Sequence, residues 1–141
     1  MSARRAPKPP AREEIALAAC VACVVAACLG AKPPDGFQWP KHLFRETRGD
    51  PAEAFARQVA IFLLATRFNL KVSRAAAAVG RDRTTASHAR DVIRDWAIDD
   101  DTDGASVWLE EVGALAERAW ALRSAQLQFE RDDAPALEDA A

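Results

Sequence analysis

The sequence predicts an all-α protein, a single small helical domain that contains a helix-turn-helix. Half of the 141 residues are apolar, many of them are alanine, and tyrosine is absent. Alanine favours helix and offers little packing surface to a sheet. Apolar residues also recur every three or four positions in several segments, which is the helical period. The length is about that of one domain.

The chain divides into three expected parts. Residues 1–12 are basic and hold three prolines, so we expect a disordered arm. Residues 13–130 are expected to form the helical domain, and residues 131–141 a disordered acidic tail. Within the domain, residues 32–40 are rich in proline and predict a loop, where Phe37 and Trp39 are expected to pack on the core.

The first expected helix runs from Glu13 to Leu29 and ends at Gly30. Its apolar run, residues 15–29, resembles the core of a signal peptide, but two glutamates adjoin it and it is short for a bilayer span. We therefore interpret it as a helix packed in the core or on a partner. Membrane tethering remains a minor alternative.

Three cysteines, Cys20, Cys23 and Cys28, lie in this apolar run. An odd number within one helix does not indicate a disulfide framework. The Cys20-x-x-Cys23 spacing is compatible with a metal site, but the only histidines are His42 and His88 and there is no second cysteine pair. We expect buried structural cysteines and no metal.

The second expected helix has a clear start signal. Asp50 is a candidate N-cap, Pro51 suits the first turn, and Glu53 is placed to complete a capping box. Apolar residues at helical spacing then continue to about Phe68.

Two shorter helices follow. Ser73 is a candidate N-cap for a helix over Arg74 to Val79 that ends at Gly80. Asp82 is the next candidate cap, for a helix from Arg83 to about Ala97.

The last expected helix follows an acidic loop of aspartates that ends at Gly104. Ser106 is its candidate cap, and the helix is expected to reach about Phe129. It carries two apolar stripes, so it should pack on its own domain or on a partner chain. The stripes are Trp108, Val112, Leu115, Ala119, Leu122 and Phe129, and Leu109, Ala116, Trp120 and Leu127.

The net charge of −2 conceals an uneven distribution. Residues 41–94 hold eleven Lys/Arg and five Asp/Glu, whereas residues 95–141 hold three and thirteen. A basic middle suits a surface that binds a polyanion, and the acidic end should lie away from it.

The helix expected from Arg83 has two distinct faces. Small and apolar residues fall on one side, while Arg83, Ser87, Arg90 and Arg94 fall on the other. With the short helix and the Gly80 turn before it, this pattern predicts a helix-turn-helix over Ser73 to Trp96. The second helix of such a motif enters the major groove, where arginine can contact guanine and threonine the thymine methyl group.

Two motifs resemble those of a known family. Residues 80–89 read Gly-Arg-Asp-Arg-Thr-Thr-Ala-Ser-His-Ala. They resemble the signature of the C-terminal DNA-binding domain of the bacterial replication initiator DnaA, which reads Gly-Arg-Asp-His-Thr-Thr, two apolar residues, then His-Ala. Residues 56–60, Ala-Arg-Gln-Val-Ala, resemble the family's Pro-Arg-Gln-x-Ala at a fitting separation. The resemblance implies the same fold, a helical domain with a helix-turn-helix of the Trp-repressor type.

The resemblance also implies roles for single residues. Arg57 corresponds to an arginine that enters the minor groove, Asp82 and Thr84 to base-contacting residues, and Thr85 to a phosphate contact. Arg83 stands where the family has a base-reading histidine, and Ala86 and Ser87 where it has larger apolar residues. His88 matches the family's histidine, which we interpret as a packing or phosphate-contacting residue.

We therefore expect a cytoplasmic, nucleoid-associated protein that binds double-stranded DNA and regulates replication initiation. No Gly-x-x-x-x-Gly-Lys-Ser/Thr loop occurs, so the initiator's ATPase is not expected, nor are a cofactor or enzymatic activity. The alternative is a mimic of the initiator domain whose partner is the initiator or a protein that regulates it. The expected DNA-binding residues are Arg57, Arg81, Asp82, Arg83, Thr84, Thr85, Ser87, His88 and Arg90.

Overall fold

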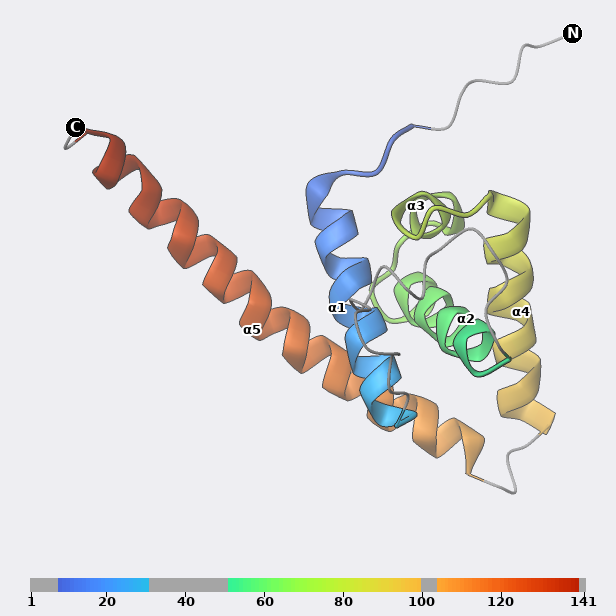
Figure 1. Cartoon of the computed structure of the whole chain (residues 1–141). Coiled ribbons are helices and arrows are strands. Elements are labelled where there is room, and N and C mark those ends of the chain that lie inside the picture. Colours follow the sequence, from blue (N-terminus) through green and yellow to red (C-terminus); the bar gives the residue numbers. More distant parts are fainter. Residues whose placement is uncertain (1–7, 31–50, 100–103, 140–141) are drawn as a thin grey trace, which may run out of the picture.

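The computed structural model describes residues 8–30, 51–99 and 104–139, and over these ranges it contains five helices and no strand (Figure 1). The prediction of an all-α fold is confirmed. The helices are α1 (Arg12–Cys28), α2 (Pro51–Thr66), α3 (Val72–Ala78), α4 (Arg83–Asp99) and α5 (Ala105–Asp139). The expected loop with Phe37 and Trp39, the Asp50 cap and most of the acidic loop lie outside the described residues.

Helix α1 is the predicted apolar helix, and it is part of the core. One face is buried, at Leu17, Ala18, Val21, Ala22, Val25 and Ala26. Gly30 follows the helix with a φ of 66°, a conformation that glycine adopts without the steric cost of a Cβ. In the described ranges, no helix combines the length and the apolar character needed to cross a membrane.

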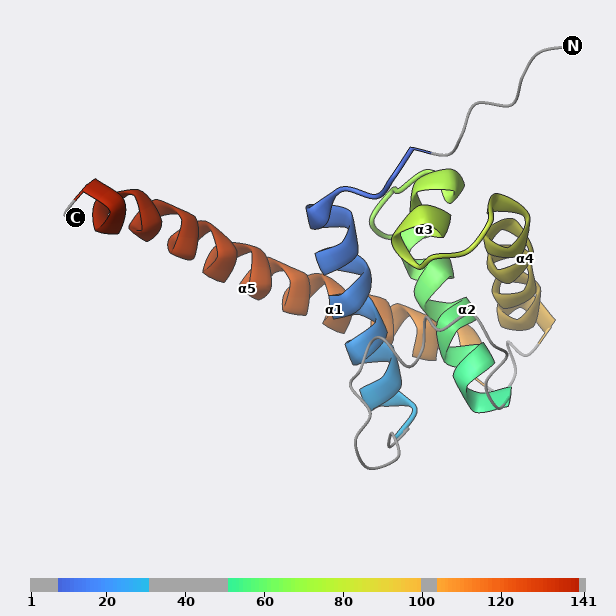
Figure 2. The ribbon, with the colours of Figure 1, turned by 45° about the horizontal axis from the view of Figure 1, so that its top comes forward.

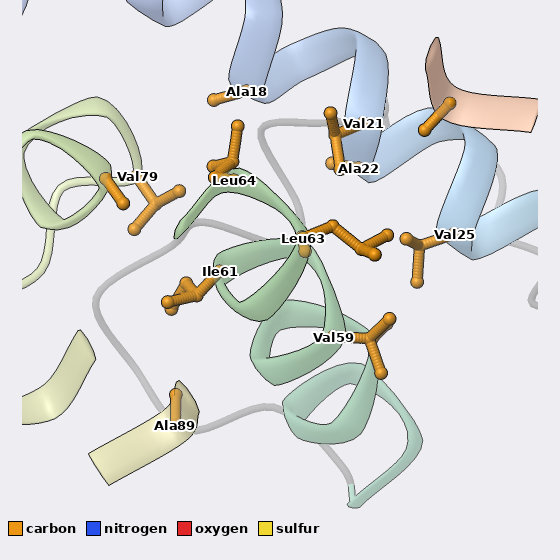
Figure 3. Close-up of a cluster of buried hydrophobic side chains, with 14 of the residues drawn as sticks. Ala18, Val21, Ala22, Val25, Val59, Ile61, Leu63, Leu64, Val79 and Ala89 are labelled. Carbon is orange, nitrogen blue, oxygen red and sulfur yellow. The ribbon is translucent and has the colours of Figure 1, made fainter. Parts of the chain in front are cut away.

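Helix α2 lies at the centre of the domain and provides its largest buried side chains. Val59, Ile61, Leu63 and Leu64 are each at most 1% exposed. In Figure 3, Leu63 and Leu64 point toward α1, while Ile61 points toward the side where Val79 and Ala89 lie. α2 is therefore enclosed on most of its circumference, and the other helices pack around it (Figure 2).

Helix α5 is much longer than the sequence indicated. It packs on α1 and then projects away from the other helices (Figures 1 and 2). The backbone stays helical to Asp139, so the expected end near Phe129 and the disordered tail from residue 131 both differ from the structure. Alanine, leucine, arginine, glutamate and glutamine fill most of the sequence after Gly113, and these residues favour helix.

Two of the predicted caps are wrong. The amides of Arg74 and Ala75 donate to the carbonyl of Lys71, at 2.8 and 2.9 Å, so α3 begins before Ser73 could cap it. In α5, the hydroxyl of Ser106 donates to the carbonyl of Ala97 at 3.1 Å instead of capping its own helix. Both serines lie inside a first turn that began earlier.

Arg67 joins the end of α2 to α5. Its guanidinium lies 2.7 Å from Glu117 and 2.9 Å from Glu110. The side chain crosses α5 at Gly113, where an added Cβ would lie 2.7 Å from the Cδ of Arg67. The glycine thus gives Arg67 room to reach glutamates on both sides of it.

Arg74 joins α3 to α1 and to the segment before it. Its guanidinium pairs with both carboxylate oxygens of Glu14. It also donates to the backbone carbonyls of Lys8 and Pro9, each at 3.0 Å. The end of the arm that we expected to be disordered is therefore held on α3, while residues 1–7 lie outside the described residues.

We expect Glu14→Gln to lower stability at neutral pH by an amount that vanishes in acid. The hydrogen bond from Arg74, and next that from the amide of Ala11, hold the pKa of Glu14 below its ordinary value of 4.5. A lowered pKa stabilises the fold above the ordinary value, and this contribution is lost as the pH falls through the lowered one. Urea unfolding of both proteins between pH 7 and 2 measures the difference.

Glu13→Gln, at the exposed neighbouring glutamate, is the control. A difference that persists unchanged to pH 2 would contradict the expectation.

Candidate nucleic-acid interface

A short turn with a defined hydrogen-bond pattern joins α3 to α4. Gly80 has a φ of 70°, and its amide donates to the carbonyl of Ala77 at 3.2 Å. The amide of Arg81 donates to the carbonyl of Ala76 at 2.9 Å. These two bonds satisfy carbonyls at the end of α3 in the Schellman arrangement, as the sequence predicted for Gly80. The direction in which the chain leaves α3 is therefore set locally.

Asp82 begins α4 as predicted. Its Oδ1 accepts a hydrogen bond from the amide of Thr85 at 2.6 Å. This bond, with further ones from the Thr85 hydroxyl and the Thr84 amide, holds the pKa of Asp82 below its ordinary value. The carboxylate is thus ionised at neutral pH and bound to its own helix. Its observed role is that of an N-cap, while the implied base contact stays a prediction.

The inner face of α4 carries small residues near its start and larger apolar residues further along, as predicted. Ala86, Ala89 and Ile93 are at most 3% exposed. They belong to one buried cluster with Ala75 and Val79 of α3 and with residues of α2. Alanines on both helices allow the backbones to approach closely. Trp96, further along this face, is half-buried against Phe55 and Trp108, with ring centroids 5.1 and 6.0 Å away.

The opposite face carries most of the predicted site residues. Arg83, Thr84, Thr85 and His88 are exposed. Ser87 and Arg90 are half-buried on the same helix, as is Arg81 in the turn before it. The structure therefore brings the predicted residues of α4 together on the first turns of the helix, with Arg81 in the turn directly before them.

The second half of α4 carries its own counter-charges. Asp91 lies 3.2 Å from Arg90 and 3.5 Å from Arg94, and Asp95 lies 3.6 Å from Arg94. The carboxylates offset the positive charge of these arginines. Among the predicted cations of α4, Arg83 at the start of the helix is thus the one without such an acidic neighbour in the described contacts.

Arg57 lies on α2 and is the predicted site residue that the structure buries. It is only 8% exposed, whereas the resemblance implied an arginine that reaches into the minor groove. The motif match does not say whether the side chain of Arg57 points to solvent or into the protein. Helix α2 is buried on most of its circumference. The structure leaves this side chain little exposed surface for such a contact, and the implied minor-groove role stays a prediction.

No local sequence signal indicated the Arg74 contact. Arg74 meets Glu14 across 60 positions of the sequence, and neither residue belongs to a recognisable motif. Lys71, exposed directly before α3, is a further cation of the α3–α4 segment that the prediction did not include. Its position directly before the first helix of the pair could have indicated it as a candidate.

The three cysteines of α1 are free thiols, and the expected burial is not complete for any of them. Cys20 and Cys28 are half-buried, and Cys23 is exposed because it lies on the side of α1 away from the core. Burial, and next the neighbouring Cys23, raises the pKa of the Cys20 thiol. Within the described residues, no group of three or more histidine, cysteine or acidic side chains is placed to hold a metal ion.

Comparisons with protein families, with characterised proteins and with solved structures found no match to this chain. The resemblance to the initiator domain therefore rests on the motifs in residues 56–60 and 80–89.

Proposed function

We propose that this chain binds double-stranded DNA through a helix-turn-helix formed by α3 and α4. One observation carries the proposal. Helix α4 packs on α2 and α3 through Ala86, Ala89 and Ile93. On its first turns it presents the exposed side chains of Arg83 and Thr84. A helix supported on one side and polar on the other can enter a major groove with its N-terminal residues at the base edges.

The chemistry of the exposed face suits this role. The guanidinium of Arg83 can donate two hydrogen bonds to the O6 and N7 atoms of guanine. The methyl group of Thr84 can contact that of thymine. Arg81 and His88 are our candidates for contacts with phosphates beside these bases, which position a protein without reading sequence. The face therefore supports a binding protein rather than an enzyme.

The resemblance to the initiator domain supports regulation of replication initiation as the process. A chain that reads the same class of site without a nucleotide-driven motor would compete with the initiator or recruit another protein beside it. Selection of bound sequences from a random duplex pool tests this directly. We expect an enriched motif, and the absence of any enrichment at low salt would contradict the proposal.

We expect Arg83→Ala to weaken binding to the selected site relative to random duplex by about 1–3 kcal/mol, because one bidentate base contact is lost. Fluorescence anisotropy with the selected duplex and with a scrambled duplex gives both affinities. Arg131→Ala is the matched control, since it removes an exposed arginine from α5. Unchanged selectivity in Arg83→Ala would show that Arg83 does not read bases.

A second candidate function is that of a protein-binding mimic of the initiator domain. The acidic partners of Arg90 and Arg94 and the burial of Arg57 favour it, since both reduce the positive charge available for phosphates. Retained binding to the initiator or its regulator, without a gel shift on any duplex, would identify this function.

A further inference from the structure

Helix α5 exposes a regular apolar stripe. Leu115, Leu122 and Phe129 follow one another at intervals of seven residues, and they are 45%, 75% and 71% exposed. The face that packs on the domain is a different one, where Leu109, Val112 and Ala116 are at most 7% exposed. The two apolar stripes predicted from the sequence are therefore not separated as expected: the domain buries Leu109 and Ala116 of one and Val112 of the other, and it leaves Leu115, Leu122 and Phe129 exposed.

The position of α5 makes the exposed stripe accessible. Beyond its contact with α1, the helix projects from the other helices (Figures 1 and 2). None of the other described helices covers Leu122 or Phe129. Large apolar side chains repeated every seven residues are the pattern by which helices pair.

We propose that this stripe pairs with the same stripe of a second copy of the chain, in an antiparallel two-helix contact. The twofold axis lies at the level of Ser124 and Ala125. This inference does not depend on DNA binding, because it uses no residue of α3 or α4.

Side-chain sizes favour this register. With the axis at Ser124 and Ala125, the large ring of Phe129 faces the small Ala119 of the second copy. In the same register Leu122 faces Gln126 of the second copy. By symmetry each contact occurs twice. The exposed Ala125 on the flank lets the two helices approach closely.

Charges on the flank select the antiparallel direction. Arg118 and Asp132 are both exposed and lie on the same side of the stripe, with Ala125 midway between them. In the antiparallel pair, Arg118 of each copy faces Asp132 of the other. A parallel pair would instead place Arg118 of one copy beside the exposed Arg123 on the other flank of the second copy, so that like charges meet. The antiparallel direction also puts the two helical domains at opposite ends of the contact.

Gln126 limits the strength of the contact. A polar residue in the seam of paired helices fixes the register but weakens association. We therefore expect an equilibrium between monomer and dimer that depends on protein concentration.

Sedimentation equilibrium of the full chain over a range of concentrations tests the proposal. We expect the wild type to dimerise, and Leu122→Glu to raise the dissociation constant at least about tenfold, because a charge enters the apolar seam. Ile98→Glu is the matched control: Ile98 is 68% exposed but lies on α4, outside the stripe, and this variant should dimerise like the wild type. Circular dichroism verifies that both variants stay helical.

A charge exchange tests the direction of pairing. Arg118→Asp alone and Asp132→Arg alone should each weaken the dimer, because each puts like charges face to face. The double variant should restore it, since the opposite charges then face each other again. A wild type that stays monomeric at every concentration, unaffected association in Leu122→Glu, or a double variant no better than the singles would each overturn the proposal.

Discussion

Leu63→Ala is expected to lower the free energy of unfolding by about 2–5 kcal/mol, the range for large-to-alanine changes in a packed core. Leu63 is 1% exposed and lies on the central helix, where its side chain points toward α1 (Figure 3). The substitution leaves a cavity between α1 and α2, because neither helix can close on it without disturbing its other contacts. Urea unfolding followed by circular dichroism measures the loss.

Ile98→Ala is the control for this prediction. It removes a comparable aliphatic side chain at a position that is 68% exposed, and we expect its effect to be within about 0.5 kcal/mol. Equal losses in the two variants would mean that α2 does not hold the centre of the fold.

Ala86→Leu is expected to destabilise the domain by about 1–3 kcal/mol, the cost of overpacking a filled interior. Ala86 is fully buried where α4 meets the domain. The added atoms must push α4 away from the helices that support it. On the proposed function, DNA affinity should therefore fall even where the variant remains folded, because the exposed residues of α4 change their position.

The matched control is Thr84→Leu, which enlarges an exposed side chain two positions earlier on the same helix. Thermal unfolding should show little change for Thr84→Leu and a lower midpoint for Ala86→Leu. If Ala86→Leu unfolded at the wild-type temperature, the close contact of α4 with the domain would be contradicted.

Local signals predicted much of the fold. Glycine after an apolar run marked the ends of α1 and α3, and Asp82 marked the start of α4, because these residues act through bonds to their own backbone. Ser73 and Ser106 failed as cap predictions for the same physical reason. A serine close to the start of a helix has the chemistry of a cap, but the backbone decides which turn comes first.

Contacts between residues that are distant in the sequence could not be predicted from local patterns. The pairing of Arg74 with Glu14 and the position of Arg67 across Gly113 depend on how helices cross, which no local pattern records. The candidate site contains one feature that the sequence predicted and one that it did not. The helical period correctly separated the buried alanines of α4 from its polar face, whereas the motif around Arg57 could not show that α2 would be enclosed on most sides.

The aspartates on the second half of α4 have a consequence for how the proposed protein would search a chromosome. Attraction to DNA of any sequence comes from cations that displace counterions from phosphates, and each neutralised phosphate contributes about −0.9 to the slope of log affinity against log salt. Arg90 and Arg94 already have acidic neighbours, so this helix has little of that general attraction to offer. Such a protein would leave non-cognate DNA quickly, and its occupancy would depend on matched bases rather than on charge.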